Sequence, residues 1–531
     1  MKYLSKVASL ACIAGVSMTL VGCGGGSSTP PVEDNTTTCP IPESVKQDIT
    51  LDQQSTRAIL GMIFESNEIG WDISDSFLFG KDASKIDLES LKNYTIQTDS
   101  LNPLEVRVAK TLNSIKPLRE IWIDSDVPMG DDLACDEGKY SLHYTIKDTD
   151  SEEDGIRSSE FGLDLSIDFD NCVLYEGSDK EKELFKPFGS ILMGTSIIAN
   201  LRDKSDDDNI TFSFNGSSKL NVKYLDQGKY DKSDDSWDFF YSIDREVSID
   251  NTNLSVNVNN IEDGQLFVYN SQGTLDSKLN WKYTDNGEKV VGEDGNTTTS
   301  KENYNGGLSL DMNIKEFMQE GNGDTYDKEE LKAYCYTHST NWLYSGIRVD
   351  YDDNEDSDKD YVTNTVTSNG ELNANGYGSW NEIESDEGEM SQNFFDLYQE
   401  NLNSKVNRNY LYESNSTDIT SEDNQTIDIN GRVGSSVLGG SASIATSNSW
   451  QTSNLFRYSI NNNSTGEIQY VWYSPYAGES IISGTNTAVV GFDYVYDDED
   501  DRNETYGYIQ IDDQPKVEYD SLEDMIEGYI E

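Results

Sequence analysis

The sequence predicts a mainly β protein: a large antiparallel β-meander, folded as a curved sheet or as an open barrel or sandwich, preceded by a small N-terminal helical segment. Two observations predict this fold. Apolar and polar residues alternate with period two in segments such as 163–169, 220–224 and 308–314, so each strand has one dry and one wet face. Parallel strands, which are buried on both faces, would instead read as continuous apolar runs.

The first residues predict an export signal. Lys2 and Lys6 precede an apolar run over 7–20 that is too short to cross a bilayer. The run ends in Leu20-Val21-Gly22-Cys23, which resembles the signal of bacterial lipoproteins, where a small residue precedes the cysteine that receives the lipid. The resemblance implies a signal peptide over 1–22, acylation of Cys23, and the outer membrane as location, because glycine rather than aspartate follows Cys23.

Four further segments follow the signal. Residues 23–42 hold the lipidated cysteine and a tether rich in glycine and proline. Apolar clusters at helical spacing predict a helical segment over 43–124. Residues 125–512 form the antiparallel β-body with acidic loops, and 513–531 form a C-terminal tail with a short helix that begins at Asp520.

Two kinds of turn signal punctuate the β-body. Acidic stretches are expected to connect strands; they lie at 148–154, 203–208, 231–235, 350–360 and 497–501. Dipeptides ending in glycine begin at Asn215, Gln272, Asn305, Asn369 and Asn430. Their intervals are too irregular for a solenoid or propeller, so they suit a long meander with variable hairpin loops. They indicate either a weak internal repeat or turn chemistry alone, since Asn-Gly is the preferred hairpin pair.

The charge of the chain limits its partners. The whole sequence has a net charge of −59, and loss of Lys2 and Lys6 with the signal would leave −61. Such a charge opposes binding to nucleic acid and to anionic lipid surfaces. We therefore expect a membrane association through the lipid anchor, no nucleic-acid partner, and divalent cations as candidate counterions.

The cysteines predict a disulfide in the β-body. Cys39, Cys135, Cys172 and Cys335 remain once the signal is cleaved and Cys23 is acylated, and export places them in an oxidising compartment. Three pairings are open. Cys135 with Cys172 is favoured because both border strand-like segments, which leaves Cys39 with Cys335 as a second pair that nothing in the sequence supports.

The segment from Cys135 to Gly189 resembles a group of uncharacterised β-rich lipoproteins of Gram-negative bacteria. The resemblance rests on Cys135-Asp136-Glu137-Gly138 before a strand, on Asn171-Cys172, and on the Asn-Gly strands that recur downstream. It implies the disulfide and the β fold, and no activity.

Little in the sequence indicates catalysis, and we assign no catalytic residue. The two histidines, His143 and His338, belong to no recognisable catalytic motif. Cys335 and His338 lack the second ligand pair of a zinc site. A Trp-rich face could stack on sugars, but core packing is the favoured role for these tryptophans, namely Trp281, Trp342, Trp380, Trp450 and Trp472.

Calcium is the candidate cofactor. Asp150, Glu152 and Asp154, followed by Gly155, have the spacing that opens an EF-hand loop, although Glu160 stands one position short of the usual bidentate acid. The alternative is a solvated loop that prevents edge-to-edge sheet pairing.

These observations together predict a non-catalytic, acylated cell-envelope lipoprotein with a structural or binding role. Two alternatives remain open. One is a polysaccharide-acting enzyme or carbohydrate-binding protein that uses carboxylates and aromatic rings. The other is a lipid or lipoprotein carrier whose apolar sheet face holds acyl chains.

Overall fold

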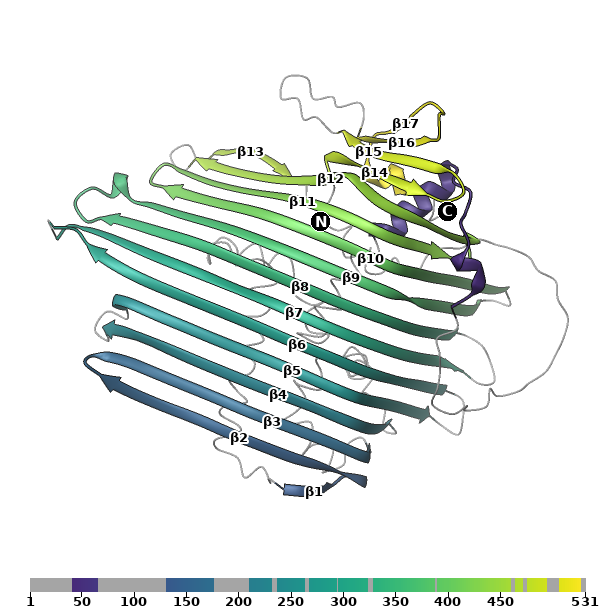
Figure 1. Cartoon of the computed structure of the whole chain (residues 1–531), viewed down its shortest axis with the longest axis horizontal. Coiled ribbons are helices and arrows are strands. Elements are labelled where there is room, and N and C mark those ends of the chain that lie inside the picture. Colours follow the sequence, from purple (N-terminus) through teal and green to yellow (C-terminus); the bar gives the residue numbers. More distant parts are fainter. Residues whose placement is uncertain are drawn as a thin grey trace.

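The computed structural model describes residues 41–64, 130–175, 210–231, 236–262, 267–293, 295–322, 328–386, 389–459, 464–470, 475–493 and 506–526. In this part of the chain, seventeen strands form one sheet (Figure 1). The strands are β1 (Gly130–Ala134), β2 (Glu137–Glu153), β3 (Ile156–Tyr175), β4 (Ile210–Asp231), β5 (Ser236–Glu262), β6 (Phe267–Val291), β7 (Thr297–Asn322), β8 (Lys328–Asp353), β9 (Tyr361–Asp386), β10 (Glu389–Asn415), β11 (Asp418–Ser435), β12 (Gly440–Ser459), β13 (Ser464–Tyr470), β14 (Ala477–Ser483), β15 (Thr487–Asp493), β16 (Gly507–Ile511) and β17 (Val517–Tyr519).

The predicted antiparallel meander is confirmed. From β1 to β13 each strand pairs with the next along the chain; β14 pairs with β12, and the order then continues to β17. The long strands reach 27 residues in β5 and β10, which is about 90 Å of extended chain. The pairing of β6 with β7 runs without a register shift from Phe267 to Val291.

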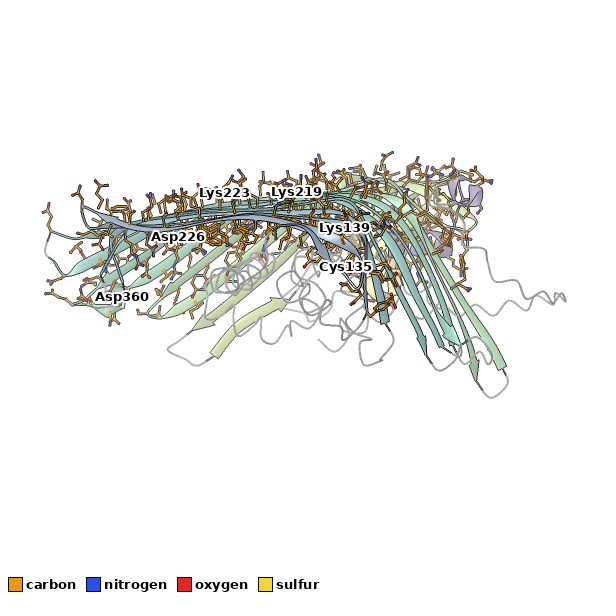
Figure 2. The ribbon with its side chains drawn as sticks, turned by 90° about the horizontal axis from the view of Figure 1, so that it is seen from below. Cys135, Lys139, Lys219, Lys223, Asp226 and Asp360 are labelled. Carbon is orange, nitrogen blue, oxygen red and sulfur yellow. A yellow bond between two sulfur atoms is a disulfide. The ribbon has the colours of Figure 1, made fainter. Side chains whose placement is uncertain are left out.

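The two faces of the sheet differ as the alternation predicts. Leu165, Leu220 and Val222 belong to the face that we call the inner face, where they are buried; it carries one continuous apolar cluster from β2 to β10. The intervening residues form the outer face. Figure 2 shows Lys219 and Lys223 projecting from that outer face along the flat part of the sheet.

The strands bend at a line of β-bulges. Asn171, Asn253 and Asn401 have φ values of 47°, 46° and 48°, and the strand register shifts at each of them. Their backbone N–H groups donate to side-chain oxygens of Asn215, Asp276 and Asn375 at 2.7, 2.6 and 2.5 Å, respectively. Bulges increase twist and bend a strand, and the strands turn downward near Cys135 in Figure 2.

The interpretation of the Asn-Gly pairs as hairpin turns is wrong. All five dipeptides lie inside strands, namely β4, β6, β7, β9 and β11. At two of them the bulges explain the glycine. A Cβ on Gly216 would lie 2.1 Å from the carbonyl oxygen of Asn253, and one on Gly431 would lie 2.5 Å from the Cα of Leu402, so only glycine fits against the bulged neighbour.

The acidic turns are only partly as predicted. Residues 148–153 belong to β2, and the connection to β3 is the two-residue turn Asp154-Gly155, with positive φ at both positions. The loop after β8 does contain the predicted acids, and Lys359 forms ion pairs with Asp353 at 3.3 Å and Asp356 at 3.1 Å. Residues 203–208, 232–235 and 497–501 lie outside the described residues.

A second apolar core joins the two ends of the chain. The predicted helical segment contains a short 3-10 helix, η1 (Glu43–Lys46), and a helix over 53–64, and its remainder lies outside the described residues. Asp52 caps the second helix by accepting the N–H of Ser55 at 2.8 Å. The buried face of this helix packs with β10 to β12, β14 to β16 and the C-terminal helix α7 (Leu522–Ile526) (Figure 1).

Candidate functional site

The most chemically diverse region described lies on the inner face, near the hairpin ends of β4 to β7. Here the apolar rows give way to polar and aromatic side chains. We call this group the tyrosine–carboxylate cluster; it consists of Tyr224, Asp226, Tyr241, Arg245, Tyr283, Asp285 and Glu302. The strand register brings the group together, because Tyr224 pairs with Arg245 and Arg245 pairs with Tyr283.

Asp285 is the centre of the cluster. Its side chain is buried, with 9% of the residue exposed. The hydroxyls of Tyr241 and Tyr283 donate to Oδ2 at 3.1 and 3.0 Å, whereas Oδ1 has no hydrogen-bond partner. Burial raises the pKa of Asp285 despite these two donors. An acceptor buried without a partner costs free energy, so this oxygen is available to a ligand donor or cation.

Glu302 lies next to Asp285 across a glycine. Gly287 pairs with Tyr241 on one side and with Glu302 on the other. The ring of Tyr241 lies across this glycine, since a Cβ on Gly287 would be 2.0 Å from the ring. Burial also raises the pKa of Glu302, and the nearby Asp285 adds to the shift. The glycine thus lets one tyrosine reach between two carboxyl groups.

An arginine and its partners complete the cluster. The guanidinium of Arg245 donates to both oxygens of Asp226, at 3.3 and 2.7 Å, and its central carbon lies 5.4 Å from the centroid of the Tyr224 ring. Burial raises the pKa of Tyr224 to about 12. This bidentate pair fixes the guanidinium plane.

A similar group recurs six strands away. Arg408 on β10 donates to both oxygens of Asp423 on β11, at 2.8 Å each, and its guanidinium lies 5.8 Å from the Tyr410 ring centroid. Between the two groups, Tyr304 lies across Gly346 and donates to Asn364 at 2.8 Å. The inner face therefore carries a band of planar polar groups from β4 to β11.

The predicted disulfide of the β-body is confirmed. The Cys135–Cys172 disulfide is present, with a Cα–Cα distance of 5.5 Å, and Cys335 is disulfide-bonded as well. Cys39 and Cys23, the predicted lipidation site, lie outside the described residues.

The residues of the calcium prediction are not arranged as a loop. Asp150 and Glu152 belong to β2, Asp154 occupies the hairpin turn, and Arg157 lies 3.6 Å from Asp150 as an ion-pair partner. No three histidine, cysteine or acidic side chains within the described ranges form a group that could hold a metal ion. The calcium site therefore stays a prediction that solution measurements must decide.

The histidines and tryptophans have structural positions. His143 is exposed on the outer face, and His338 is buried beside Thr340, with Nε2 2.7 Å from the hydroxyl. Burial lowers the pKa of His338 to about 4. Trp281, Trp342 and Trp450 are buried as core residues, whereas the Trp380 side chain and Trp472 lie outside what the structure describes.

The tyrosine–carboxylate cluster was not predicted from the sequence. With 98 acids in the chain, no pair of them stands out without the strand register. A usable signal was the combination of aromatic residues at alternate positions, such as Trp281 and Tyr283, with isolated strand glycines such as Gly287, because an aromatic ring often covers a strand glycine.

Comparisons with known proteins found no matching family model, no matching curated protein and no matching solved structure. No helix among the described residues is long and apolar enough to cross a membrane.

Proposed function

We propose that this chain is a non-catalytic, acylated lipoprotein of the cell envelope with a binding role, and that the tyrosine–carboxylate cluster binds a neutral, polyhydroxylated ligand such as a carbohydrate. The observation that carries the proposal is the buried, unpartnered Oδ1 of Asp285 among half-buried tyrosine rings. A sugar hydroxyl can donate to such an oxygen, while ring faces cover the apolar face of the sugar.

The electrostatics of the chain support a neutral ligand. The net charge of −59 repels anionic polymers at long range. Within the cluster, Asp226 already neutralises Arg245, so no free cation is offered to an acidic sugar by that pair. A neutral glycan is not repelled by the net charge and needs no free cation, so it can use the fixed donors and acceptors of the band.

The test is a glycan array followed by titration calorimetry of the hits. Asp285→Leu and Tyr283→Phe should each weaken binding, because they remove the free acceptor and one hydroxyl that orients it. Asp168→Asn on the outer face is the matched control and should leave the affinity unchanged. An array without any hit, or hits that both cluster variants bind as well as the wild type, would reject the proposal.

A second candidate function is hydrolysis of a polysaccharide by Asp285 and Glu302. The observation that favours it is that both carboxyl groups have raised pKa values and lie on adjacent strands, as acid and base pairs of glycosidases do. Release of reducing ends from the array hits, lost in Glu302→Gln but with binding kept, would establish the enzyme instead of the binding protein.

The carrier alternative has less support. The apolar residues of the inner face, including Val222 and Leu310 at 0% exposed, are already buried. Acyl chains would therefore have to displace existing contacts. Lipid that co-purifies with the chain would revive this alternative.

A further inference from the structure

The flat outer face of β2 to β7 carries an ordered pattern of charge. In two rows, lysines and carboxylates alternate from β4 to β6, and Lys282 and Glu246 form an ion pair at 3.2 Å within the chain. One row, defined by the strand register, reads Lys147, Gly162, Lys223, Glu246, Lys282 and Gly307. The next row but one reads His143, Ser166, Lys219, Asp250, Lys278 and Asp311. The charge ladder consists of four rows. They are these two rows, the row between them, and the row that passes through Leu225, next to the row of Lys223.

The charge ladder is nearly neutral in a very acidic chain. Its other two rows are Thr145, Asp164, Asn221, Ser248, Asn280 and Ser309, and Thr149, Glu160, Leu225, Asp244, Thr284 and Asn305. The four rows together hold five lysines and six carboxylates, whereas the whole chain has 39 basic and 98 acidic residues. The lysines of the ladder are exposed, and Lys219 and Lys223 stand out from the flat face in Figure 2.

We propose that this face binds a second copy of the chain, face to face, about a twofold axis that runs parallel to the strands between β4 and β5. Such an axis places β4 opposite β5 of the second copy, β3 opposite β6 and β2 opposite β7. Each row then lies opposite the same row of the second copy. Lys223 then meets Glu246 of the second copy, and Lys219 meets Asp250 of the second copy. A twofold interface must be complementary to itself in this way.

The same operation places no two like charges directly opposite one another in the four rows. Lys278 meets Ser166 of the second copy, Lys147 meets Gly307, Asp311 meets His143 and Asp164 meets Asn280. Glu160 meets Thr284, and Asp244 meets Leu225. The ladder has six carboxylates and five lysines, and like charges are kept apart because lysines and carboxylates alternate between neighbouring strands. An axis along β4 or β5 would instead place like charges opposite one another.

A hollow in the outer face fits one of these contacts. Gly162 leaves a depression of about 380 Å³ that is lined by Lys147, Glu160, Asp164, Asn221, Lys223 and Glu246. The proposed axis places Lys282 of the second copy over Gly162. Glu160 is already paired with Lys147 at 2.5 Å within the chain, so the incoming ammonium group would take Asp164 as its carboxylate partner in the hollow.

The area is sufficient for a stable dimer. Six strands at about 4.8 Å and four rows at about 6.6 Å span roughly 800 Å² per copy. A standard protein interface buries about that area on each partner.

The experiment measures the oligomeric state of the full chain by sedimentation velocity at one fixed ionic strength. Cys23→Ala is included throughout, so that a lipid anchor cannot itself drive association. One variant carries Lys219→Glu and Lys223→Glu, and a second carries Glu246→Lys and Asp250→Lys. Each alone places like charges across the axis and should weaken the dimer at least about a hundredfold, since like-charge contacts across an interface cost several kcal/mol.

An equimolar mixture of the two variants separates the interface from pairing within one chain. The acidic β4 of the first variant would face the basic β5 of the second, and the reverse, so the mixture should form a heterodimer although each variant alone is monomeric. Pairs inside each chain stay broken in the mixture. Lys301→Glu with Lys405→Glu, which changes the same charge outside the ladder, should keep the dimer.

A wild-type chain that stays monomeric, or two variants that stay monomeric when mixed, would overturn the proposal. So would loss of the dimer in the control variant, because charge alone would then explain the effect. Circular dichroism of each variant confirms that the sheet is intact.

Discussion

Removal of the Cys135–Cys172 disulfide should loosen the first long strands and leave the rest of the sheet unchanged. The bond joins Cys135, which lies between β1 and β2, to Cys172, which follows the bulged Asn171 of β3. It closes the end of the hairpin opposite the Asp154-Gly155 turn, and the two cysteines are 37 residues apart. The chain-entropy model gives about 3.9 kcal/mol for closing a loop of this length. That free energy corresponds to about a 700-fold change in a local opening equilibrium.

The assay is hydrogen exchange with mass spectrometry on the Cys135→Ala, Cys172→Ala double variant. Amides of β2 and β3 should exchange faster by up to that factor, because local opening no longer has to proceed within a closed loop. Peptides from β9 and β10 serve as the internal control, because β4 to β8 lie between them and β3 in the sheet. Equal exchange of β2 and β3 in the variant and the wild type, or uniform acceleration of all strands, would refute the reasoning.

Three further perturbations test the electrostatics. Burial lowers the pKa of His338 to about 4, against about 6.5 in the unfolded chain, so its contribution to stability is present above pH 6.5 and falls by about 3 kcal/mol towards pH 4. His338→Gln should therefore reduce the change of the urea-unfolding free energy between pH 6.5 and pH 4. The same pH dependence in the variant and the wild type would contradict this prediction. The contribution of Asp285 to stability depends on pH in the opposite direction, because its raised pKa makes the ionised carboxylate destabilising at neutral pH. Asp285→Asn should therefore raise the melting temperature at pH 7 more than at pH 4. An equal effect at both pH values would count against burial as the cause. High salt should raise the melting temperature, because the screening length falls from about 10 Å at 0.1 M to about 3 Å at 1 M; stabilisation by millimolar calcium beyond that of sodium chloride at equal ionic strength, removed by Asp150→Asn with Asp154→Asn, would identify the predicted calcium site, and coinciding curves would leave screening alone.

The alternation of side chains was enough to predict the class of the sheet, because its period depends only on which face of a strand is wet. Leu163, Leu165 and Ile167 are buried as expected, and Asp164 between them is exposed. Strand length was not predictable in this way. A two-residue turn such as Asp154-Gly155 leaves a long acidic strand end in the β2–β3 hairpin, where composition suggested a loop.

The Asn-Gly pairs show a second limit of the sequence. Asn and Gly are the residues that tolerate positive φ, and both a hairpin turn and a bulge need that conformation. The two structures differ in what the neighbouring strand supplies. At Asn171, the acceptor for the bulged N–H is Asn215, 44 residues away, and no local pattern reports such a partner.

The candidate site depends even more on register. Tyr241, Asp285 and Glu302 come from three strands, and each is an ordinary residue in its own segment. They form a site because Gly287 leaves space for the Tyr241 ring between two carboxyl groups. The charge ladder has the same origin, since its rows become visible only when β2 to β7 are aligned.

The distribution of charge gives the outer face a distinct role from the rest of the surface. Two copies with a net charge of −59 each repel one another at long range, so a contact between them needs a region where this repulsion is cancelled locally. The sheet edges do not provide one, because the terminal strands β1 and β17 are short, five and three residues respectively, as edges that avoid pairing usually are. The charge ladder is flat, close to neutral and complementary to itself. Among the surfaces that the structure describes, the proposed contact through this face would be closed by its twofold axis, so it would give a pair and no extended assembly.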